Sequence, residues 1–458
     1  MALSKREKLT KTEFAWTMYD WANSVYVTMI MAAIFPIYFT TVAGAAGVSG
    51  DIVWGYGTSL ATLLVVVLAP VLGSMADFHG LKKRLLIICL IVGCVFTLAM
   101  ALVNIWQLML VGYVISYVGF ALSCLFYDSF LTDVTTPERM DMVSAKGYAM
   151  GYLGGSTVPF LVALILLFLA PKLHIDTTTV VKICVVMASV WWAVFSIPII
   201  CKVHQKYYIP RPEGSIIKAA FTNLAKTIRD IGKNRPLLLF MVAYFLYIDG
   251  VGTVIHMATS YGSTLGLDSI NMILALMITQ IVAIPCSIGF AKLAKRIGTR
   301  SALFCGIAVY MAVCLIGFYM GFSLESASKA AQAAMMTGGQ AAYDAIYEPA
   351  RKFSQVLFWV LAVMVGTSQG GIQALSRSQF SRMIPPERSN EFFGFFDIFG
   401  KFATMVGPFL YASLATLTGR SSFGILSLIL LFILGFFVLL KTPKIVFQKS
   451  YLDLHQKK

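Results

Sequence analysis

The chain has 458 residues, of which 58% are hydrophobic and 12% are charged, and its formal net charge is +15. Soluble globular proteins carry roughly 25% charged residues, and a water-soluble fold of this length could not bury so much apolar surface. The composition therefore excludes a soluble domain and indicates a polytopic α-helical membrane protein.

Along the chain, long apolar stretches alternate with short charged turns, and each stretch can form a spanning helix of about 20 residues. The predicted spans are 14–43, 52–75, 84–103, 107–130, 144–170, 180–202, 236–261, 269–292, 301–322, 355–378, 391–417 and 422–441. The longest polar interruption falls between the sixth and the seventh span. The sequence thus predicts an all-α membrane protein with twelve transmembrane helices in two pseudo-symmetric six-helix bundles. These are residues 1–202 and 236–458, joined by a cytoplasmic central loop at 203–235.

Most of the 36 basic residues fall in the two tails and in the loops that follow even-numbered spans. This bias follows the positive-inside rule if both termini are cytoplasmic. Anionic lipid of the inner leaflet then accounts for the net charge, and no nucleic-acid partner is expected. In the central loop, 216–231 has the pattern of an amphipathic helix on the inner surface. The outer stretch 324–348 is expected to be helical and loosely packed, with no assigned function.

One block of residues occurs twice at a constant offset of 249 positions. The first copy has Ser129, Pro137, Glu138, Arg139, Gly151 and Pro159, and the second has Ser378, Pro386, Glu387, Arg388, Gly400 and Pro408. Each copy is a charged turn between two apolar stretches. A helix–turn–helix unit that recurs in both halves of a membrane protein is typical of a pseudo-symmetric transporter.

The turn after the second span contains four candidate conformational residues, Gly73, Asp77, Gly80 and Arg84. Gly73 allows two helices to approach closely, Gly80 permits a tight turn, and Arg84 lies at the lipid interface. Asp77 can bind the N-terminal end of a neighbouring helix, where free N–H groups and the helix dipole favour an anion. A bond present in one conformation only would bias a two-state equilibrium. The alternative is a plain turn with basic residues at the interface, and Lys295 at the corresponding place argues against a second latch.

Three sequence strings resemble one branch of a known superfamily. They are Tyr19-Asp20-Trp21-Ala22-Asn23-Ser24, the glycine-rich run from Gly147 to Gly155, and the run from Gly366 to Ser378. With two sets of six helices, these strings resemble the major facilitator superfamily, and within it the vacuole-effluxer branch. The resemblance implies a secondary transporter and, from the yeast autophagy-related member, amino-acid export. It also implies that helices one, four, seven and ten line the central cavity.

Polar side chains within predicted spans are costly in lipid and should face a cavity or a partner. The candidates for the solute pathway are Asp20 and Asn23 in the first span, Asp249 and His256 in the seventh, and Gln369 and Gln373 in the tenth. Asp249 and His256 are the candidates for proton coupling, although a hydrogen-bonded core histidine is an equal alternative. Asp20 could instead pair with a base or cap a neighbouring helix.

Asp128 and Arg377 are separated by the same offset of 249 residues, and both lie near inner ends of spans. We expect an ion pair that closes an inner gate. The alternative is two separate charges at the lipid interface.

The sequence therefore predicts an alternating-access carrier of a small polar solute, such as an amino acid, that is coupled to protons and active as a monomer. The expected location is the cell membrane, or the vacuolar membrane in a eukaryote. The sequence contains no HExxH or Walker motif, so an enzyme is not expected, and neither is a cofactor or a metal. The remaining alternative is a non-transporting sensor or scaffold on a transporter fold.

Overall fold

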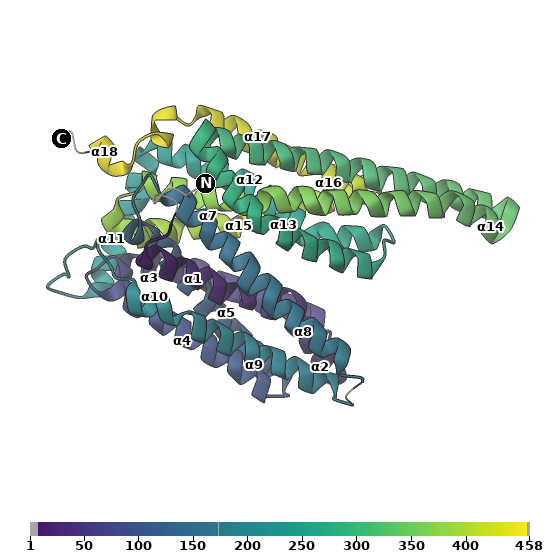
Figure 1. The fold of residues 1–458 in the computed structure, drawn as a ribbon, viewed down its shortest axis with the longest axis horizontal. Helices are drawn as coiled ribbons and strands as arrows, with labels where there is room; N and C mark the ends of the chain where they lie inside the picture. The colour runs from purple at the N-terminus through teal and green to yellow at the C-terminus, as the bar shows by residue number, and fades with distance from the viewer. Residues whose placement is uncertain (1–7, 173, 456–458) are drawn as a thin grey trace. The chain divides into compact units, whose positions relative to one another are not determined.

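The computed structural model describes residues 8–172 and 174–455, and this part of the chain consists of helices joined by turns and by a longer connection at 203–215 (Figure 1). Contacts divide the chain into two compact units. The first comprises Met1–Asn234, Arg377–Ile398 and Lys449–Lys458, and the second comprises Arg235–Ser376 and Phe399–Gln448. Residues 377–398, which the sequence places in the second bundle, thus make their contacts within the first unit. The predicted bundle boundaries at residues 202 and 236 stay a prediction.

The number of spans agrees with the prediction. Eleven helical stretches in the described residues are long and apolar enough to cross a membrane. One of them, α14 (Thr299–Met383), consists of two helices that meet at Gly339, where φ is 67°. Counted as two, α14 brings the total to the twelve predicted spans, and the all-α membrane fold is confirmed. The basic residues of the tail at positions 5 and 6 and at 457 and 458 lie outside the described residues.

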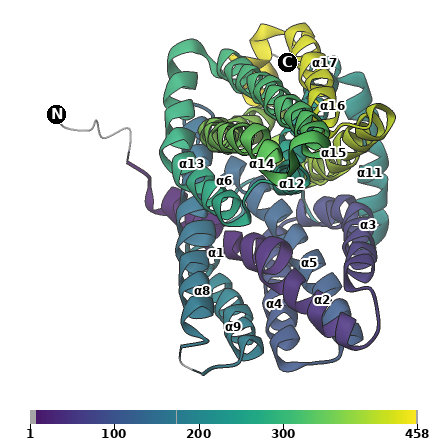
Figure 2. The same cartoon turned by 90° about the vertical axis from the view of Figure 1, so that its right-hand side faces the viewer.

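The first unit holds the N-terminal helices, and two of its helices continue through π-helical turns. Its elements are α1 (Lys11–Tyr26), η2 (Val27–Ala33), α2 (Phe35–Ala45), α3 (Gly50–Ala76), α4 (Leu81–Leu102), α5 (Trp106–Ser129), α6 (Leu131–Val134), α7 (Met140–Met150), η3 (Gly151–Thr157), α8 (Val158–Leu169), α9 (Thr177–Phe195), α10 (Ile197–Lys202), α11 (Ile216–Lys233), η4 (Pro386–Arg388) and α18 (Tyr451–His455). Figure 2 shows α4 beside α5 and α8 beside α9, pairs that also contact each other.

A proline follows each of the two π-helical turns. Pro36 comes soon after η2, and Pro159 soon after η3. Proline lacks an N–H, and its ring clashes with the carbonyl four residues earlier. A locally widened turn relieves that clash, and such turns are frequent at functional sites. The two widened turns contact each other in the first unit.

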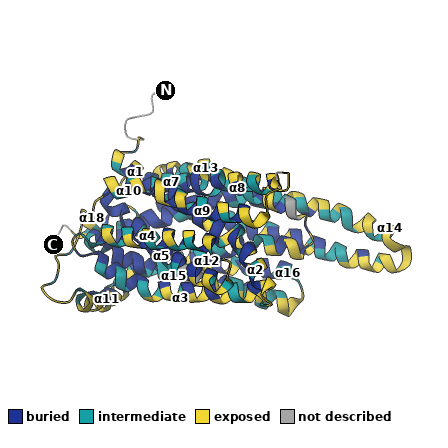
Figure 3. Cartoon of the chain, turned by 90° about the horizontal axis from the view of Figure 1, so that it is seen from below, coloured by how far each residue is buried: buried dark blue, intermediate teal, exposed yellow. Residues whose placement is uncertain are grey.

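The second unit contains α12 (Arg235–Thr264), α13 (Ser269–Ile297), most of α14, α16 (Ser421–Ser427), α17 (Ile429–Lys441) and η5 (Lys444–Phe447). Helix α15 (Ser389–Thr418) begins in the first unit and continues in the second. The two arms of α14 form a hairpin that extends beyond the turn between α12 and α13 (Figure 1). The predicted helical stretch 324–348 forms the far part of this hairpin, and many of its residues are exposed (Figure 3).

A buried ion pair joins the start of α4 to α6. The Nζ atom of Lys82 lies 2.6 Å from Oδ2 of Asp133, and both side chains are fully buried. Asp133 also accepts the backbone N–H groups of Lys206 (2.7 Å) and Tyr207 (3.0 Å). Removing one partner of such a pair leaves an uncompensated buried charge.

We expect Lys82→Met to destabilise the protein by about 3–5 kcal/mol for this reason. The measurement is thermal unfolding of purified protein in detergent. Lys83→Met, at the neighbouring and less buried position, is the matched control and should change the midpoint little. Equal effects of the two substitutions would contradict the structural role of the pair.

Candidate functional site

Asp77 binds the N-terminal end of a helix, as its sequence context predicts. It is buried directly after α3, and its Oδ1 accepts the backbone N–H of Asn390 (2.9 Å) and the Nδ2 of the same residue (2.7 Å). Its Oδ2 accepts the N–H of Glu391 (3.0 Å). These N–H groups belong to the first turn of α15, where the helix itself offers no acceptor. The structure contains this contact, and its conformational role is proposed below.

The surroundings of Asp77 explain the two glycines of the turn. A Cβ on Gly73 would lie 2.6 Å from the carbonyl oxygen of Asn390, so a larger residue would separate α3 from α15. Gly80 has φ 73°, in the left-handed region that favours glycine. Burial raises the pKa of Asp77 to about 8, while hydrogen bonds from Asn390 and the charge of Lys82 act in the opposite direction.

Among the consecutive bases 82–84, Lys82 is the one whose side chain reaches the contact between Asp77 and α15. Its Nζ donates to Ser389 Oγ (3.1 Å) and to the carbonyl oxygen of Ser129 (3.0 Å). Arg84, the predicted residue, is exposed on α4, and the described part of the chain shows no hydrogen bond of its side chain. The sequence has three consecutive bases, 82–84, and periodicity alone did not indicate which one turns inward.

The predicted ion pair between Asp128 and Arg377 is present, and Asp20 joins it. Arg377 donates from Nη1 to Asp128 Oδ1 (2.8 Å) and from Nη2 to Asp20 Oδ2 (3.4 Å). It also donates from Nε to Ser144 Oγ (2.9 Å) and from Nη2 to the Ser144 carbonyl (3.0 Å). The hydroxyl of Tyr127 donates to Asp20 Oδ2 (2.6 Å). Two carboxylates on α1 and α5 therefore share one guanidinium, and the two charges are not separate.

Aromatic rings pack against the guanidinium of Arg377. Its central carbon lies 4.8 Å from the ring centre of Trp16 and 4.5 Å from that of Tyr148. Cation–π contacts of this kind add attraction where the cation is removed from water. Arg377 is also almost fully buried, whereas the side chains of Asp20 and Asp128 are 13% and 31% exposed. The site is therefore a charge-paired junction around a buried cation.

Around Arg377, equivalent residues of the two copies of the repeated block make equivalent contacts with each other. Ser129 donates to the side-chain oxygen of Asn390 (2.5 Å), and Ser378 donates to Asp141. Ser378 is the repeat partner of Ser129, and Asn390 is the repeat partner of Asp141, each 249 residues apart. Asp128 and Arg377, themselves repeat partners, contact each other between these two bonds. This is the pattern of a two-fold axis passing through an interface, in which residue i contacts j and j contacts i.

Two further arginines bind the same region and were not among the sequence candidates. Arg382 donates to Asp141 Oδ1 (2.6 Å). Arg388 pairs with Asp230 of α11 (2.9 Å) and with Glu391 (3.3 Å). The repeated Pro-Glu-Arg block marked Arg388, but no sequence signal connected it to a helix of the central loop.

The pathway candidates of the second unit lie in different environments. Asp249 is fully buried, and both its oxygens accept the N–H of Gly407 (3.0 and 2.9 Å), next to Pro408 of α15. Thr253 donates to the same carboxylate (3.4 Å). His256 is exposed on α12, and within the described residues no hydrogen bond joins it to Asp249.

Gln369 is buried and lines a cavity of about 80 Å³ between α12, α13 and α14. The amide of Gln280 lies in the same wall, which is otherwise mostly apolar and includes Val254, Leu276 and Phe358. Gln373 is half-buried and does not line this cavity. In the first unit, Asn23 is buried and donates to the sulfur of Cys124 (3.6 Å).

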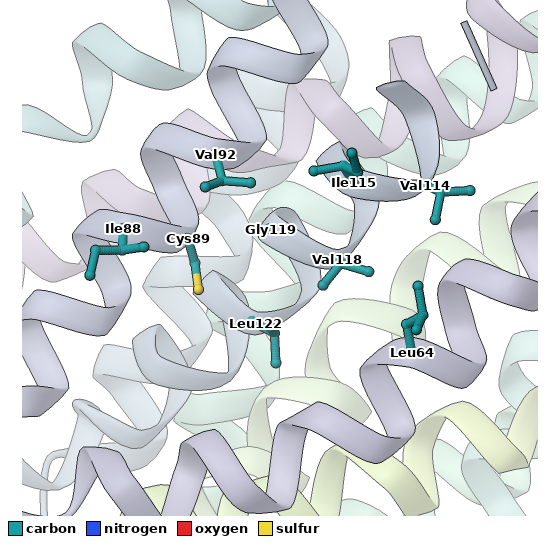
Figure 4. A pocket seen from close by; sticks show the side chains of 9 residues that line it. All are labelled: Leu64, Ile88, Cys89, Val92, Val114, Ile115, Val118, Gly119 and Leu122. Atoms are coloured by element: carbon teal, nitrogen blue, oxygen red, sulfur yellow. The ribbon is translucent and has the colours of Figure 1, made fainter. Parts of the chain in front are cut away.

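A second hollow of about 230 Å³ lies in the first unit, between α3, α4 and α5. Figure 4 shows that its wall consists of apolar side chains and Cys89, with Gly119 at its centre. Such a wall offers no partner to a polar solute, so the cavity at Gln369 is the better candidate.

Comparison with known proteins identifies the family. Residues 51–444 match the family "Vacuole effluxer Atg22 like". The chain belongs to this family. It is 40% identical over 445 residues to "Uncharacterized MFS-type transporter YxiO" of Bacillus subtilis, covering 96% of each chain.

Fungal Atg22 proteins are more distant relatives. The chain is 26% identical over 313 residues to "Autophagy-related protein 22" of Botryotinia fuckeliana, which covers 65% of this chain and 49% of that protein. The chain therefore spans about half the length of this fungal relative. The match to "Autophagy-related protein 22" of Eremothecium gossypii is 21% identical over 457 residues and covers 87% and 84% of the two chains.

Solved structures show the fold. The chain superposes on the proton:xylose symporter XylE with a TM-score of 0.64 at 12% identity, covering 94% and 95% of the two chains. It superposes on the fucose:proton symporter FucP of E. coli with a TM-score of 0.65, also at 12% identity. The Atg22-like chain thus has the major facilitator fold. The family match and the 40% identical MFS-type transporter show that it is a multi-pass secondary transporter and not an enzyme.

The hydrogen bonds of Asp77 predict how this Atg22-like transporter responds to Asp77→Asn. An amide presents one acceptor and places an NH₂ against the N–H groups of α15, so the contact should weaken. If the contact stabilises one conformation, transport rate should fall much more than solute affinity, which radiolabelled uptake and binding would measure separately. Asp176→Asn, at an exposed position, is the control. Equal losses of rate and affinity would argue against a conformational role.

Proposed function

We propose that the chain is a proton-coupled carrier of a small polar or zwitterionic solute, with a free amino acid as the first candidate, and that it works by alternating access. The observation that carries this proposal is the reciprocal set of contacts around Arg377. Contacts that relate two repeats by a pseudo-two-fold axis are suited to a junction that opens and closes as the repeats rock.

In this proposal the junction is a gate made of three sets of polar contacts. Asp77 on the N-terminal end of α15, Arg377 with its two aspartates, and the two serine bonds together stabilise the closed arrangement. Asp77 and Arg377 are buried, so breaking their contacts without supplying water would leave unpaired charges. The gate should therefore exchange between two discrete arrangements, in which water replaces the protein partners in the open one.

The solute would bind through amides and pathway carboxylates. Gln369 and Gln280 offer both donors and acceptors in a mainly apolar wall, which suits a zwitterion with a small side chain. Asp20, Asn23, Gln373 and His256 remain candidates for the rest of the pathway. The name of the family, which describes a vacuole effluxer, supports the export of a solute, and the amino acid is our first candidate for that solute.

Asp249 is our candidate for the coupling proton. Its described partners are an N–H group and a hydroxyl, and no basic side chain of the described residues pairs with it. A buried carboxylate without a cation is costly when charged, and a proton removes that cost. The Gly407 contact then links its protonation to α15, the helix whose other end binds Asp77.

Two cysteine pairs test the gate directly. Ser129→Cys with Asn390→Cys, and Ser378→Cys with Asp141→Cys, should each be joined by a short bis-methanethiosulfonate cross-linker in protein lacking its native cysteines, because the side chains of each pair are in hydrogen-bond contact. Cross-linking should stop transport, and reduction should restore it. The pair Ser129→Cys with Asp141→Cys, within one repeat, is the control. Full transport by a fully cross-linked pair would contradict the gate.

Solute and coupling are tested together on purified and reconstituted protein. A thermal-shift screen of amino acids, short peptides and sugars should identify a ligand that raises the melting temperature, since a ligand at 100 times its Kd stabilises by about 2.7 kcal/mol. Gln369→Ala should reduce that shift.

In proteoliposomes, a pH gradient should drive uptake by the native protein but not by Asp249→Asn. Uptake that ignores the gradient in the native protein would remove proton coupling from the proposal.

A further inference from the structure

We propose that α11 is a docking surface for anionic phospholipid headgroups, and that lipid bound there stabilises the contact between Asp77 and α15. The first part concerns a surface to which the transport mechanism assigns no role. The second part rests on the gate proposed above, and the experiment below separates the two.

Helix α11 has three faces of different chemistry. At 100° per residue, Ala220, Thr227 and Ile231 fall on one side, and all three are buried. The next side carries Ile217, Phe221 and Ile228, whose side chains are 57%, 54% and 56% exposed. The side after that carries exposed bases. These are Lys218, Lys226, Arg229 and Lys233.

This order of faces matches a helix that lies in a membrane interface. The exposed apolar side is next to the face packed on the protein, so it can enter the acyl region beside the helical unit. The basic side is then directed to the headgroups. Asp230 is the only acidic residue of α11, and it is engaged by Arg388. The remaining charge of the helix is thus entirely positive. A positive helix binds a surface of anionic lipid more tightly than a surface of neutral lipid.

The position of α11 in the first unit agrees with this assignment. Ser74 Oγ, near the end of α3, donates to the carbonyl of Ala220 (3.1 Å). The span formed by α3 ends at Ala76, so α11 lies at the level where that span leaves the membrane. An exposed row of isoleucine and phenylalanine at this level would otherwise face water.

A short chain of contacts connects α11 to the gate. Arg388 donates to Asp230 (2.9 Å) and to Thr227 of α11, and it also binds the buried carboxylate of Glu391 (3.3 Å). The N–H of Glu391 is one of the groups that Asp77 accepts. Fixing α11 in the interface would therefore fix Arg388 and Glu391 in the geometry that Asp77 requires.

Amide hydrogen exchange of the full chain in nanodiscs tests both parts without knowledge of the solute. Discs of phosphatidylcholine are compared with discs that also contain phosphatidylglycerol. We expect slower exchange in the 216–233 peptide with phosphatidylglycerol, by about fivefold for each basic side chain engaged. A peptide containing Asn390 and Glu391 should also exchange more slowly, because Asp77 accepts both N–H groups.

Substitutions identify the side chains that cause the slower exchange. Lys218→Gln with Lys226→Gln and Arg229→Gln should remove the dependence on phosphatidylglycerol, whereas Lys172→Gln with Lys329→Gln and Lys352→Gln, three exposed bases elsewhere, should retain it. Arg388→Gln should keep the effect on α11 and lose it at Asn390 and Glu391.

Each outcome decides one part. Equal exchange of α11 in the two kinds of disc, or an effect that survives the loss of its three bases, overturns lipid docking. Protection of α11 that never reaches Asn390 and Glu391 in the native protein overturns the coupling alone. If Asp77→Asn leaves exchange at Asn390 and Glu391 unchanged, the proposed latch fails, while docking of lipid on α11 is judged separately.

Discussion

One buried guanidinium organises the part of the molecule that we assign to gating. Arg377 carries a single positive charge into a site walled by aromatic rings, and the protein supplies Asp20 and Asp128 to balance it. Such a group cannot be left unpaired in a low-dielectric site without a cost of several kcal/mol. The surrounding helices are therefore restricted to arrangements that either pair this charge or admit water to it. That restriction turns a packing interface into a two-state element, because intermediate separations satisfy neither condition.

The two repeats contribute to this junction symmetrically in position and asymmetrically in charge. Ser129 and Ser378 make equivalent bonds to Asn390 and Asp141, yet the central pair consists of one acid and one base. Asp77 directly follows α3, whereas the corresponding residue of the second half is Lys295, which lies in the last turn of α13 and is exposed. Charge symmetry would place like charges opposite each other on the axis, so the asymmetry is what allows the repeats to attract. It also concentrates the latch on one turn, which contacts the N-terminal end of α15.

Much of the fold and of the gate could be predicted from the sequence, because the residue patterns that determine them are local or periodic. Hydropathy located the twelve spans, the offset of 249 paired Asp128 with Arg377, and the combination of small residues, acid and glycine indicated that Asp77 would meet a helix end. What the sequence did not reveal depends on helix rotation and on distance. Lys82 rather than Arg84 turns inward, Asp20 reaches Arg377 from another helix, and Asp249 is directed to Gly407 rather than to His256. A stripe of polar residues defines a face of a helix but not which member of that face finds a partner.

The same reasoning explains why the solute is less well defined than the gate. A gate is made of groups that satisfy one another, so their contacts are visible in the chain itself, whereas a solute site consists of groups that await a partner. Gln369 and Gln280 fit that description in an apolar wall, but an amide accepts many ligands.

The measurement that tests the account most directly is the distance between the turn after α3 and the start of α15 in reconstituted protein. Spin labels at Arg84→Cys and Glu387→Cys, read by double electron–electron resonance, would report whether that junction opens. The account predicts two discrete distances, with the longer one enriched by Asp77→Asn. A single distance that is unchanged by Asp77→Asn would contradict it.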